Sequence, residues 1–339
     1  MAAGRARRLR LGGQGLRLSC SRSPVTDMNA AIPLLIDTDP GVDDALALLM
    51  AFDDPAHRVV GLTIAAGNVG LRHTVANALK LCEVAGREDV PVFAGCAAPL
   101  LHAAPDAAYV HGQDGFGDTG YVPCSRAASA EHAALAILRL SHEHAGRLLL
   151  VALGPLTNLA LALKLDPTLP QRIGRLVVMG GSVAGRGNIT PAAEFNVYFD
   201  PEAAHLVFEA FPRFDLADWD ATLTHGLPHA RVEAWLAAGS TRGRFFEGIS
   251  RQTREWSADR RGDDWFAADA LAMAFALAPE GAIELAERPI DVCLGRGAGR
   301  GATIVDWNRQ TGRPDAARIL LRYDQGAFEE RIRRALAAG

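Results

Sequence analysis

The stretch that decides the fold is LLIDTDPGVDDALALL, residues 34–49. It opens with the apolar run of a buried strand, and an amphipathic helical pattern, VDDALALLMAF, begins at Val42. Four carboxylates lie at the junction between the two: Asp37, Asp39, Asp43 and Asp44. A strand that passes through a short turn into a helix is the first half of a β-α-β unit.

The same alternation continues along the chain. Strand patterns at 58–67, 90–95, 148–153 and 175–180 are separated by helical patterns at 71–86 and near 129–145, after Gly154 and from Pro201. Beyond about residue 220 the pattern becomes more helical, near 228–238, 242–258 and 267–277, with strands around 302–307 and 317–324. This order predicts an α/β fold, a mostly parallel, Rossmann-like open sheet with helices on both faces and the ligand site at the carboxyl ends of the strands. We expect residues 32–339 to form a single domain.

Composition limits the possible functions. The chain has 339 residues, of which 49% are hydrophobic, so it can bury a large core, and its net charge of −4 offers no general basic field for a nucleic acid polymer. No run approaches the roughly 18 apolar residues of a membrane span. Five widely spaced cysteines suit neither a disulfide framework nor a zinc site, so we expect reduced thiols in a cytoplasmic protein.

The first 27 residues, rich in Arg, Gly and Ser, have no regular apolar period and no uninterrupted apolar stretch of the length that a signal peptide needs. We expect a disordered extension here. An upstream start codon ahead of a natural start at Met28 is one explanation for it.

Two long segments break the alternation, one at about 97–127 and one at about 181–199. Loops of that length in a compact domain are usually functional, so we expect lids or substrate walls. The glycine-rich, basic stretch at 295–301 lies between strand-like segments, which favours a hairpin loop over a phosphate cradle.

The acidic junction is the strongest functional signal. Four carboxylates in eight residues repel one another unless a cation lies among them, and a hard divalent ion takes carboxylate oxygens. Two carboxylates in a first helical turn can also serve as caps, so a structural role remains open for Asp43 and Asp44. An EF-hand loop starting at Asp37 fails, because it would place Val42 and Leu48 where Gly and Glu are required. A phosphatase of the D-x-D type remains open, but it gives no joint role to Asp43 and Asp44.

These residues, DTDPGVDDALAL at 37–48, resemble the N-terminal signature of the inosine-uridine-preferring nucleoside hydrolases. The resemblance continues through GNVG at 67–70, HGQDG at 111–115, LGPLTNLA at 153–160, VVMGG at 177–181, GNITPAAEFNVYFDPEAA at 187–204 and ADALA at 268–272. It covers residues 32 to about 323. It implies calcium-dependent hydrolysis of ribonucleosides to ribose and free nucleobase by a homodimer or homotetramer.

The resemblance also implies a metal site. Asp39, Asp44 and Asp269 would supply carboxylates to Ca²⁺, and the backbone carbonyl of Leu153 would complete the protein ligands. Asp39 would also be the general base that takes a proton from the attacking water.

Ribose recognition follows from the same resemblance. The implied sugar-binding residues are Asp43, Asn68, Asn188, Glu194 and Asn196, with Asp269 shared between sugar and metal. Met179 is expected near the sugar and Phe195 near the base. Outside the family context, Asn68 and Asn188 each follow a glycine, so turn formation is the alternative role.

One position departs from the family pattern. Many members carry a His directly before the last metal-binding Asp, where it protonates the departing base, and this chain has Ala268. His111 is our first alternative for that acid, and a merely structural loop histidine is the competing interpretation. Trp256 and Trp265 could stack on the base or belong to the core. A nucleoside-binding protein without turnover is therefore the second functional hypothesis.

Overall fold

The structure, a computed structural model, describes residues 31–339 together with Met1. Ala31–Gly339 pack into one compact unit. The extension predicted for residues 1–27 lies, apart from Met1, outside the described residues.

An eight-stranded sheet forms the centre of this unit, in the order β3-β2-β1-β4-β5-β6-β12-β9. The first seven strands pair in parallel and β9 pairs with β12 in the antiparallel direction. The mostly parallel sheet predicted from the sequence is therefore confirmed. The strands are β1 (Ile32–Thr38), β2 (His57–Ile64), β3 (Val92–Ala94), β4 (Leu148–Ala152), β5 (Ile173–Met179), β6 (Phe214–Ala217), β9 (Ala282–Arg288) and β12 (Ala317–Tyr323).

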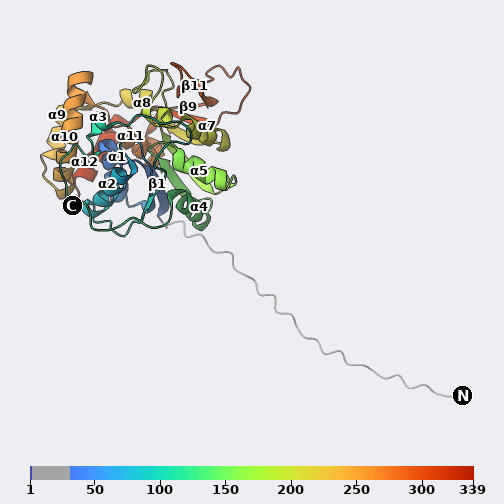
Figure 1. Cartoon of the computed structure of the whole chain (residues 1–339), viewed down its shortest axis with the longest axis horizontal. Coiled ribbons are helices and arrows are strands. Elements are labelled where there is room, and N and C mark those ends of the chain that lie inside the picture. Colours follow the sequence, from blue (N-terminus) through green and yellow to red (C-terminus); the bar gives the residue numbers. More distant parts are fainter. Residues whose placement is uncertain (2–30) are drawn as a thin grey trace. The chain divides into compact units, whose positions relative to one another are not determined.

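Helices cover both faces of the sheet because alternate side chains of each buried strand point to opposite sides. Leu34 and Ile36 of β1 belong to one apolar cluster and Leu35 belongs to the other. Figure 1 shows the two groups of helices on either side of β1. The first cluster contains side chains of α1 (Val42–Asp53), α2 (Leu71–Val84), α10 (Thr241–Arg261), α11 (Ala268–Leu277) and α12 (Gln325–Ala337), and the second those of α4 (Ala133–Glu143), α5 (Thr157–Leu165) and α7 (Pro201–Ala210).

Helix α1 is buried on nearly all sides, since it packs against α11 and α12 as well as against the sheet. Its sequence fits that position, because a helix that is apolar all round needs a fully enclosed place. The N-terminus of α1 follows directly on the carboxyl end of β1. The packing of α1 on α11 brings Asp43 and Asp44 next to Asp269, which lies in the first turn of α11.

The remaining elements are short. The antiparallel pair β10 (Ile290–Val292) and β11 (Thr303–Val305) confirms the hairpin predicted around 295–301. A second small pair joins β7 (Leu227–Pro228) to β8 (Asp264–Trp265). Short helices lie within or beside the long loops: α3 (Ala108–His111), α6 (Phe195–Phe199), α8 (Trp219–Leu223) and α9 (His229–Leu236).

Two further expectations can be compared with the structure. No helix in the described part of the chain is long and apolar enough to cross a membrane. Cys82, Cys96, Cys124 and Cys293 are free thiols, as predicted, and Cys20 lies outside the described residues.

An ion-pair bridge links three strands of the sheet to α11. The Asp215 carboxylate on β6, almost fully buried, accepts hydrogen bonds from Arg175 of β5 at 2.7 Å and from Arg318 of β12 at 2.6 Å. Arg175 also donates to the carbonyl of Ala276 at 2.8 Å, and both guanidinium groups lie over the ring of Phe275. The bridge therefore fixes the C-terminal end of α11 against the sheet.

We expect Asp215→Ala to lower the free energy of unfolding by about 2 kcal/mol. Removing one partner of a buried pair leaves uncompensated charge, and the partial exposure of the two arginines reduces the usual penalty. Chemical denaturation would measure the change. Glu330→Gln, which breaks an exposed pair with Arg333, is the matched control and should leave the unfolding midpoint where it is. Equal effects of the two substitutions would contradict the assigned role of the bridge.

Candidate active site

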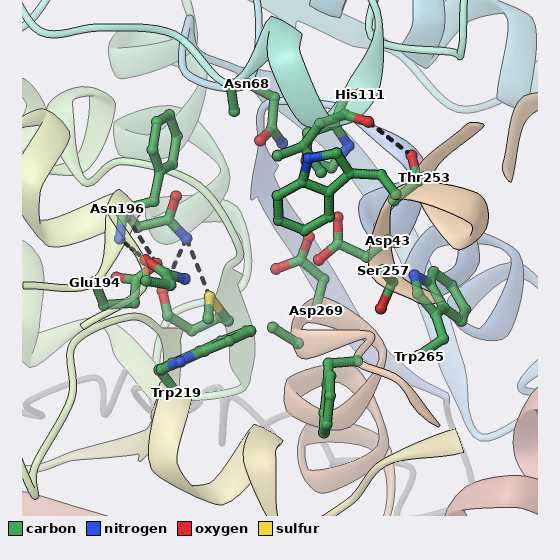
Figure 2. Close-up of a pocket in the computed structure, with 18 of the residues that line it drawn as sticks. Asp43, Asn68, His111, Glu194, Asn196, Trp219, Thr253, Ser257, Trp265 and Asp269 are labelled. Atoms are coloured by element: carbon green, nitrogen blue, oxygen red, sulfur yellow. Dashed lines mark hydrogen bonds between the residues drawn. The ribbon is translucent and has the colours of Figure 1, made fainter. Parts of the chain in front are cut away.

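A pocket opens at the carboxyl ends of β1, β4 and β5, where the α/β architecture predicts it. Its walls come from the N-termini of α1 and α11, the loops after β2, β4 and β5, helix α3 and the last turns of α10. Figure 2 shows side chains from these segments turned toward a common space. Ten of the residues predicted from the sequence line it: Asp43, Asn68, His111, Leu153, Met179, Asn188, Glu194, Phe195, Asn196 and Asp269.

Three carboxylates meet at one end of the pocket. Asp43, Asp44 and Asp269 each offer an oxygen within 4.8 Å of the others, and Figure 2 shows the carboxylates of Asp43 and Asp269 side by side. Burial raises the pKa of all three, that of Asp43 to about 6, and mutual repulsion adds to the effect at Asp44 and Asp269. The family resemblance implies that Asp43 binds the sugar, and the structure also brings its carboxylate into the acidic cluster.

Asp39 lies beside this cluster and is 1% exposed. Its Oδ2 accepts a hydrogen bond from the backbone N–H of Asn68 at 2.7 Å, while its buried Oδ1 has no partner among the described residues. Gly67 and Gly154 enclose the carboxylate so tightly that a Cβ at either position would lie 2.1 or 2.2 Å from one of its oxygens. Burial, followed by the charge of Asp44, raises the pKa of Asp39 well above its ordinary value.

The other two carboxylates of the junction have structural partners. Asp44 accepts hydrogen bonds from the N–H of Gly41 and the amide of Asn68, both at 2.9 Å, and from the hydroxyl of Thr38, so it also caps α1. Asp37 accepts hydrogen bonds from Thr63 of β2 and from Asn158 of α5. The structure thus separates Asp37 from the three-carboxylate cluster.

The donor set fits a hard divalent cation. The carboxylate oxygens of Asp43, Asp44 and Asp269 crowd together, and in Asp39, which lies beside them, the buried Oδ1 has no hydrogen-bond donor among the described residues. Oxygen-rich, anionic sites of this kind suit Ca²⁺ and Mg²⁺. The fourth predicted ligand, the Leu153 carbonyl, accepts a hydrogen bond from the Asn196 amide at 2.6 Å, which leaves the second lone pair of its oxygen for a cation.

The loop at 181–199 forms a wall that its own polar side chains hold in place. Glu194 caps α6 and accepts bonds from the N–H groups of Gly181 at 2.8 Å and Asn196 at 2.9 Å, and burial raises its pKa to about 7. Asn188 Oδ1 accepts from the N–H of Phe195 at 2.8 Å. The turn-stabilising role considered for Asn188 is therefore present, and the same side chain also lines the pocket.

His111 lies above the N-terminus of α1. Its Nδ1 accepts the backbone N–H of Val42 at 3.1 Å, which leaves Nε2 to carry the proton. Burial lowers the pKa of His111 to about 4. The side chain is thus neutral near pH 7 and can donate a hydrogen bond, but it lacks the extra proton of an imidazolium. Its role as the leaving-group acid stays a prediction.

Aromatic side chains surround the other end of the pocket. Trp256 and Trp265 line it, and Trp265 is also a core residue that packs on Phe246 with ring centres 6.0 Å apart. Ala268 lines the pocket beside Asp269. Sequence reasoning missed eight of the lining residues: Ala107, Tyr109, Val110, Trp219, Thr253, Ser257, Arg261 and Phe266. The spacing of four between 253, 257 and 261 was the available signal, but a solvent-facing helical stripe has the same period.

The chain is similar to proteins of known family along most of its length. The family described as inosine-uridine preferring nucleoside hydrolase matches residues 34–330. Uridine nucleosidase 1 from Arabidopsis thaliana is 47% identical over 176 residues, 52% of this chain and 52% of that protein, so the chain spans about half the length of that relative.

Two other similarities extend over most of the chain. A pyrimidine-specific ribonucleoside hydrolase from Escherichia coli is 32% identical over 305 residues, 88% of this chain and 96% of that protein. The solved structure of a plant nucleoside hydrolase superposes with a TM-score of 0.86 at 29% identity, covering 91% of this chain and 100% of that one. Since the family match runs from the first strand of the sheet into the last helix, this chain belongs to the inosine-uridine preferring nucleoside hydrolases.

Proposed function

We propose that this protein hydrolyses the N-glycosidic bond of ribonucleosides to give ribose and free nucleobase, with Ca²⁺ as its metal and Asp39 as general base. The observation that carries the proposal is the division of one pocket into two ends. Three carboxylates meet in one part of it, and the indole rings of Trp219 and Trp256 enclose Arg261 in another. A ribonucleoside has the same division, since its hydroxylated sugar is polar and its base has flat aromatic faces.

The acidic end is suited to a ribose. Vicinal hydroxyl groups donate and accept hydrogen bonds, so carboxylates and amides can pair both functions. Asp43, Asn68 and Asn196 would bind these hydroxyls, together with Asp269, Asn188 and Glu194. Most of them are already held by bonds to the backbone or to one another, which limits the entropy lost on binding. Met179 and Phe195 would contact the sugar and the base.

Asp39 is the group best suited to take a proton from the attacking water. Gly67 and Gly154 fix its carboxylate, and its free Oδ1 offers an acceptor. Water would attack the anomeric carbon of the ribose, the bond to the base nitrogen would break, and the proton would pass to Asp39. Burial and the neighbouring carboxylates raise the pKa of Asp39, and a cation bound beside it would lower that pKa again, so the ionised carboxylate would be available to accept the proton.

When bound among Asp39, Asp44, Asp269 and the Leu153 carbonyl, a divalent cation supplies a Lewis acid that makes water more acidic and gives the sugar hydroxyls a fixed anchor. Calcium is our choice because it tolerates crowded carboxylates and a higher number of ligands than magnesium does.

A protein that binds nucleosides without turnover is the second candidate. Ala268 favours this second candidate, because the residue beside Asp269 in the pocket wall then has no proton to donate to the departing base. His111 is neutral and does not replace an imidazolium.

We also propose one domain over residues 32–339, a cytoplasmic location and a homodimer or homotetramer.

Ribose release tests the function directly. We expect ribose from at least one of inosine, adenosine, guanosine, uridine and cytidine when calcium is present, and none after chelation, as a reducing-sugar assay would measure. Nucleoside binding without ribose would favour the second candidate, and inorganic phosphate from nucleotides would instead revive the phosphatase hypothesis.

Calcium should also stabilise the fold, because it would neutralise carboxylates that burial now penalises. At 100 times its dissociation constant, a ligand specific to the native state adds about 3 kcal/mol to the free energy of unfolding. We therefore expect a higher melting temperature with calcium than with chelator, and a smaller calcium effect in Asp269→Asn. Identical melting curves with calcium and with chelator would argue against the metal site.

Asp39→Asn should still bind nucleoside but turn it over at least ~100-fold more slowly, which is the usual scale for a lost general base. Asp37→Asn is the matched control, since Asp37 is equally buried two residues away but bonds to Thr63 and Asn158 outside the cluster. Single-turnover kinetics would separate binding from chemistry. Comparable rates for wild type and Asp39→Asn would refute the assigned role.

A further inference from the structure

One face of α10 leads along the aromatic end of the pocket. Thr253, Ser257 and Arg261 are spaced by four residues, so they share a helical stripe, and all three line the pocket. The hydroxyl of Thr253 donates to the carbonyl of Val110 at 3.1 Å, and that of Ser257 to the carbonyl of Asp264 at 3.2 Å. Figure 2 shows Thr253 and Ser257 on this wall. Arg261, the last residue of the helix, differs because its side chain makes no hydrogen bond or ion pair within residues 31–339.

Two indole rings hold the guanidinium of Arg261. Its central carbon lies 4.6 Å from the ring centre of Trp219 and 5.2 Å from that of Trp256. Cation–π contacts attract the charge to the faces of the rings, most strongly where water is partly excluded. They use none of the five N–H donors of the group, so its hydrogen-bonding capacity remains available to a ligand.

The charge lies within electrostatic range of the acidic end. Asp43 attracts Arg261, yet the two groups form no ion pair. A ribose bound at the carboxylates would therefore direct its base toward the indoles and the guanidinium. Nucleobases present acceptors at their edges, and arginine pairs with such edges through parallel N–H groups.

We propose that Arg261 stabilises the negative charge that develops on the nucleobase as the glycosidic bond breaks, which makes it a catalytic residue for the leaving group. This inference rests on the proposed hydrolase function. The guanidinium would do so as a fixed positive charge and a pair of hydrogen-bond donors, without giving up a proton. Arg261 would thereby compensate for the missing acidic histidine, whose position Ala268 occupies in this chain.

The step balances without a protein acid. The electrons of the carbon–nitrogen bond move to the base nitrogen and spread over ring acceptors such as the pyrimidine O2, which Arg261 contacts. The oxygen of water bonds to the anomeric carbon and its proton passes to the general base. The base anion takes a proton from solvent water as it leaves, and the general base returns its own to solvent.

Charge balance for the acidic cluster is the competing role for Arg261. The two roles differ in their dependence on the leaving group. A lost charge balance would slow every riboside alike, whereas lost leaving-group stabilisation would slow only those with a poorly stabilised anion.

The experiment compares a nucleoside with 4-nitrophenyl β-D-ribofuranoside, whose nitrophenolate leaves as a stable anion. With calcium present, Arg261→Met should lose about 100-fold in kcat on the best nucleoside, the scale for one removed electrostatic donor, and keep nearly full turnover of the nitrophenyl riboside. Arg261→Lys keeps the charge but not the paired donors, so it should also slow the nucleoside selectively. Arg260→Met is the matched control, since Arg260 also lies over Trp256, at 5.0 Å, but outside the pocket lining, and both rates should stay at wild-type values.

Each outcome decides between the roles. Equal losses on both substrates in folded Arg261→Met, or an unaffected nucleoside rate, would overturn the proposal. If Arg261→Met does not fold, Arg261→Lys decides: wild-type rates or equal losses on both substrates overturn the leaving-group role, and a selective loss on the nucleoside supports it. A wild-type protein that cleaves neither substrate would show instead that the hydrolase function itself is wrong.

Discussion

The enclosure of Asp39 is the constraint on which the rest of the site depends. Its carboxylate is held between Gly67 and Gly154, two glycines on loops that follow different strands, and any larger side chain at either position would collide with it. Because β1 lies between β2 and β4, the three loops meet at one edge of the sheet, and the turn into α1 then places Asp44 beside Asp39. The acidic end of the pocket thus results from the order of the strands, from the lack of a Cβ at Gly67 and Gly154, and from the burial of α1. The burial that raises the pKa of these groups also makes a cation favourable there.

Much of the sheet follows from the sequence because its strands are strongly apolar and alternate with long helical patterns. β6 is the exception: FDLA is short, and nothing local shows that β12, about 100 residues later, will pair on its outer side. Pairing of this kind depends on contacts between distant segments, which periodicity does not encode. The antiparallel β9 also lacks a clear pattern, since most of its side chains are partly or fully exposed.

The candidate site likewise has one part that the sequence predicts and one part that it does not. Its sugar and metal end was predictable because the residues lie in continuous motifs, where Asp43 and Asp44 open a helix and Glu194, Phe195 and Asn196 are consecutive. Its aromatic end was not predictable, because Trp219, Arg261 and Phe266 come from a region without such a motif. They meet only in the folded chain, where Arg261 and Phe266 both contact the ring of Trp219. A tryptophan in a helical pattern more often belongs to the core than to a binding site, and Trp265 is a core residue that also lines the pocket. Helical spacing alone does not separate a stripe that faces a pocket from one that faces solvent.

The position of β12 has a consequence for how the chain acquires its structure. This strand lies inside the sheet, between β6 and β9, although it is synthesised after every other strand of that sheet. Until residues 317–323 are available, β6 has an open edge and β9 has no partner in the sheet. A nascent chain that already contains every residue of the pocket therefore still exposes unpaired backbone, which is a template for association with other chains. Synthesis of residues 317–323 is thus the step that ends this vulnerability, and α12, which follows directly, then covers α1.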